Sequence, residues 1–382
     1  MMFSPFKIFI YILIITALFG CTSINNKEFK EFNFNLPSNN ITEKIFREIK
    51  SISMKNNVEI IHSLNLKDEE TTFIKGFLAN YYLSNKYSRN TKKVFFTTVT
   101  EKLKFCKNTN VNSTLVILNE NVYKKLQANC NLQKSSTYLV NLDEANIPNS
   151  KSIKSISIKD QLFFDNENIL EIIRQNKFVY VSSKIEEIEK FQNFAKQNNF
   201  LINNNNLILL KENNDFEIFI AEVFGKEDSL RRNRNVEKIL NQDLKFVSRK
   251  RNDIEAIILS VSSESSKRLL PALKFNLLLN LKIFNMPNHY DSWNNTSSPN
   301  DLDFSKGLEF PILVNKINFG DREFSSLSSN QKVVYSLGFD MLGIVNDQNY
   351  FGFLGQYYLK NNKINLKPIS LSFFEDKILQ SF

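Results

Sequence analysis

The chain has few of the residues that enzymes most often use for catalysis or metal binding. Its 382 residues include 2 histidines, 3 cysteines and 1 tryptophan. No HExxH, GxSxG, GxGxxG, P-loop or CxxC pattern occurs in it. Residues 329–332 match SxxK, but the companion motifs are missing and a helix should begin at this point. The sequence therefore predicts a protein that is not an enzyme and that uses no metal and no other cofactor.

Composition bounds the class of protein further. Hydrophobic residues make up 42% of the chain, which excludes wholesale disorder, and the formal charge is +9. No RRM, helix-turn-helix or zinc-finger pattern accompanies this charge, so nucleic acid is not an expected partner. The basic runs either form a solvated face or contact an acidic partner or anionic glycan strands. These runs are Arg231, Arg232 and Arg234, and Arg249, Lys250 and Arg251.

Residues 1–20 have the form of a signal peptide. Lys7 precedes an apolar run over residues 8–19, which is too short for a bilayer because a spanning helix needs about 20 residues. The following Gly20-Cys21 has the form of a bacterial lipobox, in which Cys21 becomes the lipidated N-terminus. An uncleaved anchor with an incidental cysteine is the alternative. The residue after the cysteine is Thr22 and not aspartate. By resemblance to the sorting signals of Gram-negative lipoproteins, this favours the periplasmic side of the outer membrane.

Residues 21–57 are predicted to form the lipidated N-terminus and a tether. The segment is polar and rich in asparagine, and it contains Pro37. A short helix is expected over residues 41–52. Fully extended, about 35 residues at about 3.3 Å each would reach about 115 Å, and a flexible tether would reach much less.

From residue 58 onward, strand and helix patterns alternate, which predicts an α/β fold with parallel sheets. The clearest unit starts with the apolar run at residues 254–261, which lacks alternation and so indicates a strand buried on both faces. Ser262 then offers a helix N-cap, and leucines follow at helical spacing. A second short strand is expected over residues 281–286. This is a β-α-β crossover.

Several segments around this unit resemble one family. Basic residues precede DIEAIILSVSSESSKRLLPALKF (253–275), and NLKIF (280–284) and GLEFPIL (307–313) follow. The likeness extends upstream over residues 229–246 and downstream to FGFLGQYYLKNNKINLKPISLSFF (351–374). In the order and spacing of these segments, the chain resembles the LppC lipoprotein family, whose members are outer-membrane activators of class A penicillin-binding proteins. Longer members carry an N-terminal helical-repeat domain, and no 34-residue repeat is found here.

The resemblance implies two doubly wound lobes of type I periplasmic-binding-protein architecture, between which the chain crosses three times. We expect residues 58–159 and 309–345 to form the first lobe. Residues 160–308 and 346–382 should form the second. Within the C-terminal strands, Asn361-Asn362 is predicted to form a hairpin turn, because asparagine tolerates positive φ.

Two cysteines besides Cys21 suggest a disulfide. Cys106 and Cys130 are expected near the ends of the helices that follow the second and third strands of the first lobe, which would be neighbours on one face of the sheet. Such helices run the same way on one sheet face, so their C-terminal ends could meet. An oxidising periplasm permits the bond.

A polar loop after residue 286 holds three aromatic or imidazole side chains. His289, Tyr290 and Trp293 could contact a partner or pack against the base of their own loop. Together with Arg249, Lys250 and Arg251, they are the candidate contact residues.

The resemblance implies an enzyme regulator that binds and activates a class A penicillin-binding protein, and so promotes peptidoglycan synthesis. Its partners would be that enzyme, the outer membrane through the lipid anchor, and peptidoglycan as a further candidate. The alternative is a solute-binding lipoprotein that traps an amino acid or peptide between its lobes. A hydrolase acting on the cell wall is disfavoured by the missing catalytic motifs.

Overall fold

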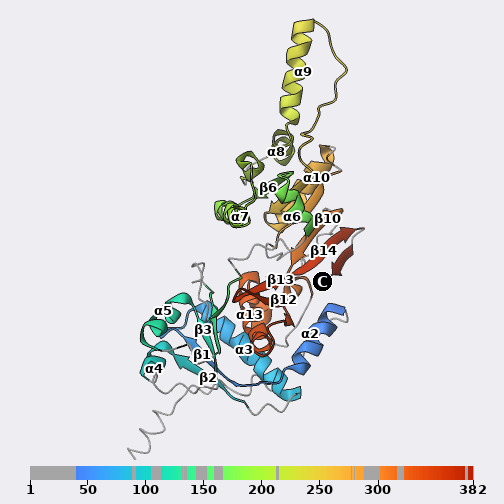
Figure 1. The fold of residues 1–382 in the computed structure, drawn as a ribbon. Coiled ribbons are helices and arrows are strands. Elements are labelled where there is room, and N and C mark those ends of the chain that lie inside the picture. The colour runs from blue at the N-terminus through green and yellow to red at the C-terminus, as the bar shows by residue number, and fades with distance from the viewer. Residues whose placement is uncertain are drawn as a thin grey trace, which may run out of the picture.

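The structure is a computed structural model. It describes residues 40–87, 92–104, 113–130, 132, 136–142, 153–158, 167–211, 215–276, 278, 280–287, 302–315, 322–374 and 377–381. The described residues form two sheets of mostly parallel strands, each covered by helices. Each sheet belongs to its own lobe, and Figure 1 shows the first lobe at the bottom and the second above it. This is the expected α/β class.

The first sheet has the strand order β11-β12-β13-β5-β4-β3-β1-β2. The strands β1 to β5 are parallel to their neighbours, and β11, β12 and β13 form an antiparallel meander that joins β5 through a parallel pair. The bounds are β1 Asn57–His62, β2 Val94–Thr98, β3 Ser113–Leu118, β4 Ser136–Val140, β5 Lys154–Ile156, β11 Phe351–Gly352, β12 Gly355–Lys360 and β13 Lys363–Lys367.

The second sheet has the order β15-β14-β10-β9-β8-β6-β7. The interior strand β8, between β9 and β6, is buried at all five residues, as the unbroken apolar run predicts. Antiparallel β14 and β15 complete one edge. The bounds are β6 Phe178–Ser182, β7 Leu207–Leu209, β8 Ala256–Ser260, β9 Lys282–Asn285, β10 Ser305–Glu309, β14 Ile369–Phe374 and β15 Lys377–Ser381.

Helices cover both faces of each sheet. In the first lobe, successive side chains of β1 and β3 point to opposite faces of the sheet. One face packs against α3 and α13, and the other packs against α4 and α5. In the second, β6 and β8 alternate between α8 and α10 on one face and α6 and α7 on the other. The bounds are α2 Asn40–Ser51, α3 Asp68–Tyr87, α4 Val99–Lys104, α5 Glu120–Asn129, α6 Glu167–Arg174, α7 Ile185–Gln197, η3 Asn204–Asn206, α8 Phe216–Val223, α9 Lys226–Leu240, α10 Ser263–Phe275, α11 Pro311–Val314, α12 Arg322–Ser326 and α13 Ser329–Asn346.

The crossover around α10 forms as predicted. Ser262 is the N-cap of α10, and its hydroxyl accepts a hydrogen bond from the Ser265 backbone N–H at 3.1 Å. The helix connects β8 to β9, which are parallel neighbours. Asn361 and Asn362, with φ of 52° and 60°, form the predicted hairpin turn between β12 and β13.

Two predicted boundaries are wrong. Residues 346–382 were expected to lie wholly in the second lobe, but β11, β12 and β13 belong to the first sheet and only β14 and β15 to the second. The hairpin turn brings β13 back beside β5, with Lys363 opposite Ser155, so the choice of sheet depends on pairing with a strand far away in the chain. Likewise, residues 40–51 are not tether, because Ile45 and Ile49 of α2 are fully buried against the first lobe.

Candidate partner-binding site

Helix α9 and the segment that returns from it project from the second lobe, at the end far from the first (Figure 1). We call residues 226–250 the arm. Gly225, with φ of 70°, turns the chain from α8 into α9, and Asn241, with φ of 52°, ends the helix in the left-handed conformation. Of the 15 residues of α9, only Ser229 is buried. The arm is therefore nearly all surface.

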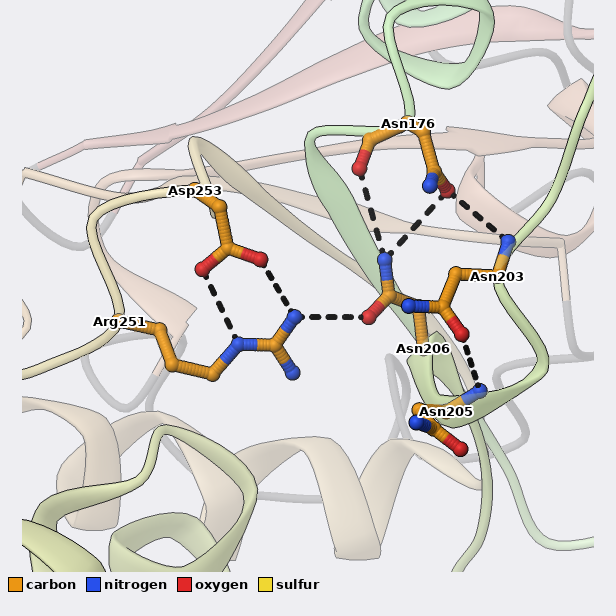
Figure 2. A network of polar contacts seen from close by, with 6 residues as sticks. All are labelled: Asn176, Asn203, Asn205, Asn206, Arg251 and Asp253. Atoms are coloured by element: carbon orange, nitrogen blue, oxygen red, sulfur yellow. Dashed lines mark hydrogen bonds and ion pairs between the residues drawn. The ribbon is translucent and has the colours of Figure 1, made fainter.

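Arg251 fixes the base of the arm. Its guanidinium donates to Asp253 through Nε at 3.1 Å and through a terminal nitrogen at 2.5 Å, and the same terminal nitrogen donates to Asn206 Oδ1 at 3.0 Å (Figure 2). Its backbone N–H donates to the Phe224 carbonyl at 2.9 Å. The hydrogen bond from Arg251 lowers the pKa of Asp253, and the same bond raises that of Arg251. Both groups are thus held in their charged forms.

Three asparagines extend this network into the lobe. Asn206 is 1% exposed, and its amide lies 3.5 Å from the backbone and side-chain oxygens of Asn176 (Figure 2). The Asn176 side chain also accepts from the Asn203 backbone N–H at 3.2 Å. Arg251 is thereby joined to the turn after α6 and to η3, two segments that belong to the packed lobe. The base of the arm is rigidly placed by these contacts.

Few polar contacts hold the return segment beside α9. The Arg249 backbone N–H donates to Ser229 Oγ at 3.0 Å. Nearer the tip, Glu237 Oε1 accepts from Asn233 Nδ2 at 2.9 Å and from the Leu244 backbone N–H at 3.1 Å. The Arg249 contact uses the backbone, so its side chain stays exposed.

Two lysines, Lys226 and Lys250, also lie at the base of the arm. The Lys226 ammonium donates to the Asn276 carbonyl. Burial lowers the pKa of Lys226, and the nearby positive charge of Lys250 adds to this effect. Lys250 therefore lies close to another cation and at a partly exposed position.

The structure thus separates the three candidate arginine and lysine residues. Arg249 and Lys250 are at the surface, whereas the Arg251 side chain is engaged within the chain. His289, Tyr290 and Trp293, and also Cys21 and Cys106, lie outside the described residues. Their roles remain predictions.

Ser328 and His62 have structural roles. Ser328 forms a capping box with Gln331 at the start of α13, so the SxxK match at residues 329–332 is the first turn of a helix. His62 is nearly buried, and its Nδ1 lies 2.8 Å from the Ser63 carbonyl oxygen. Within the described ranges, no group of three or more histidine, cysteine or acidic residues could hold a metal ion.

The end of the arm far from its base is apolar, which the sequence did not predict. Several large side chains there are exposed: Val236, Ile239, Leu240, Leu244, Phe246 and Val247. The one hint in the sequence is that Val236, Ile239 and Leu240 follow a run rich in arginine and do not continue an apolar face along the helix, so they have no evident place in a core.

Among the described helices, none combines the length and the hydropathy that a membrane span requires.

Comparison with known proteins relates this arrangement to one group of structures. No protein-family model matches the sequence, and no curated protein matches it. The fold is similar to the LpoA (YraM) C-domain from Haemophilus influenzae, a regulator of PBP1A, with a TM-score of 0.54 and 13% identity over 85% of this chain and 100% of that one. It is similar to full-length LpoA from Haemophilus influenzae, with a TM-score of 0.54 and 13% identity over 86% of this chain.

The match covers 59% of the full-length LpoA chain. At this level of identity the likeness concerns the fold. The chain therefore has two sheets of mostly parallel strands, covered by helices and arranged as in the LpoA C-domain.

Proposed function

We propose that this protein binds a class A penicillin-binding protein and activates it. The observation that supports this most is the similarity in fold to the whole C-domain of LpoA, a regulator of PBP1A. The order of family-like segments over residues 229–374 agrees with it. Regulation of a synthase, and not catalysis, is the role that both support.

An activator of this kind needs no reactive groups. It must bind the active conformation of the enzyme more tightly than the inactive one. A tenfold shift in population requires about 1.4 kcal/mol of difference in binding free energy, which a modest protein interface supplies.

The location is part of the proposal. Cys21 would carry the lipid that holds the protein on the periplasmic side of the outer membrane, and residues 22–39 would form the tether. Because α2 is packed into the first lobe, the tether is about half as long as residues 21–57 would make it. At about 3.3 Å per residue it reaches at most about 60 Å.

The test is the activity of the purified class A penicillin-binding protein from the same organism, with and without the full chain in detergent. We expect faster glycan-strand formation, faster cross-linking or both. If saturating protein neither binds the enzyme nor changes either rate, the proposal is wrong. A small molecule co-purified in stoichiometric amount would then favour solute binding.

A further inference from the structure

The arm has little support from the rest of the chain. Helix α9 buries one residue, Ser229, and residues 241–247 are all exposed. Isolated helices of about 12–15 residues are marginal in water, because most helical stability in proteins comes from packing. Yet the base of the arm is fixed by the Arg251 network. This combination of a fixed base and an uncovered shaft is suited to contact with another molecule.

The end of the arm exposes apolar surface. Ile239 is 81% exposed, Val247 77% and Leu240 53%. Scattered single apolar side chains need no explanation, but these residues belong to one short projecting element. Covering them would remove apolar area from water and stabilise a complex.

The shaft of the arm is basic. Residues 226–250 contain eight basic and four acidic residues. Arg231, Arg234 and Lys238 are spaced at i, i+3 and i+7, so they line one face of α9. Arg231 pairs with Asp228 at 2.8 Å, but both side chains are more than 60% exposed, and such a pair contributes little. These cations are therefore available to an acidic partner.

The charge and the apolar pattern together select the kind of partner. A second copy of the arm would place like charges together, which opposes association. A helix that lies in a membrane surface needs an apolar face along its length, whereas the exposed large apolar residues of α9 are grouped toward its C-terminal end. A protein groove with an apolar floor and an acidic rim fits both features.

We propose that the arm, residues 226–250, is a protein-docking element that inserts its apolar end into an acidic-rimmed pocket of the partner. This inference rests on the proposed function, and it names the class A penicillin-binding protein as the owner of that pocket. The basic face steers and orients the encounter, while burial of Ile239 and Val247 holds the complex.

Two arm variants of the full chain test this proposal. One reverses charge on the basic face with Arg234→Glu and Lys238→Glu, and the other removes apolar surface with Ile239→Asn and Val247→Asn. The matched control is Lys184→Glu with Lys360→Glu, two exposed lysines outside the arm, which changes net charge by the same amount. All replaced side chains of the arm are exposed, so the thermal midpoint of each variant should stay that of the wild type.

Binding to the purified class A penicillin-binding protein is measured by interferometry at low and moderate salt, and binding to vesicles of anionic phospholipid is measured in parallel. We expect each arm variant to bind the enzyme about tenfold more weakly or worse, and the control to bind as the wild type does. The charge variant should also lose most of the salt dependence.

The outcomes separate the two proposals. If the wild type binds and stimulates the enzyme but both arm variants do so equally well, the arm proposal alone is overturned. If the arm variants lose only vesicle binding, the arm is a membrane contact and the docking proposal is wrong. If the wild type neither binds nor stimulates the enzyme, the proposed function fails and the arm proposal with it.

Discussion

Gly338 of α13 lies directly against the backbone carbonyl of Phe73 in α3. A β-carbon built at Gly338 would lie well under 3.0 Å from the Phe73 carbonyl oxygen. The relationship is reciprocal, since Gly76 of α3 meets the Tyr335 carbonyl of α13 in the same way. The same two helices are also joined by a hydrogen bond, which the Asn80 side-chain amide of α3 donates to the Phe339 carbonyl of α13 at 2.6 Å. The two glycines set how closely these helices of the first lobe approach.

Gly338→Ala should therefore destabilise the first lobe. Alanine favours a helix over glycine by about 1 kcal/mol, but overpacking against backbone atoms costs about 1–3 kcal/mol or more, because no side chain can move aside. We expect a net loss of unfolding free energy in urea. Asn330→Ala, at an exposed position of the same helix, is the control and should change stability by less than about 0.5 kcal/mol. Equal stability of both variants would contradict the close contact.

The buried carboxyl of Asp340 should make stability depend on pH. Burial raises its pKa to about 7, although it accepts hydrogen bonds from the backbone N–H groups of Phe353 and Leu354 and from the Tyr357 hydroxyl. Since the unperturbed value is 3.8, the folded state holds a proton that the unfolded state has lost over this window. The contribution to stability therefore falls as pH rises from about 4 to about 7, and it is constant above that.

This pH dependence is measured by urea unfolding across the window. The wild type should lose up to about 1.4 kcal/mol per pH unit through this group. Asp340→Asn, which cannot ionise, should remove that slope, and Asp243→Asn, at an exposed position, should leave it. Parallel curves for the wild type and Asp340→Asn would rule out titration of this carboxyl.

Cys106 and Cys130 should form a disulfide. Cys130 is 9% exposed and disulfide-bonded, and Cys106 is the predicted partner. Opening the bond with a double serine variant should cost about 3 kcal/mol in the chain-entropy model. Peptide mapping without reductant should recover the two cysteines in one cross-linked peptide. Alkylation of both thiols in the unreduced, denatured protein would show that the pairing is wrong.

Cys21 should be the acylated residue. Cys21→Ser should leave the protein without acyl label and release it from the outer-membrane fraction, because several acyl chains give stable anchoring and the rest of the tether is polar. Cys130→Ser serves as the matched control and should still be labelled. An acylated, membrane-bound Cys21→Ser protein would contradict the lipobox interpretation.

Local patterns predicted the elements well, and long-range pairing poorly. The apolar run of β8, the Ser262 cap and the Asn361-Asn362 turn depend on neighbouring residues, and each forms as expected. Which sheet receives β13 depends instead on its pairing with β5, more than 200 residues earlier in the chain. Such a choice leaves no local signal.

The candidate site shows the same division. The basic run 249–251 was visible, but its sequence alone did not show that Arg251 would pair with Asp253 and Asn206 while Arg249 stayed exposed. The burial of α2 was also missed, because its short amphipathic pattern gives no indication of the surface that it covers. The apolar end of the arm required the structure, since exposure is a property of the whole fold.

The central claim is activation of a class A penicillin-binding protein by the folded part of this chain. The most direct measurement titrates the purified enzyme with soluble Cys21→Ser protein and follows glycan-strand formation and cross-linking. Because the tether adds only effective concentration, we predict the same maximal stimulation as with the lipidated protein, reached at higher concentration. Unchanged rates at a protein concentration that saturates binding, or no binding at all, would contradict the account.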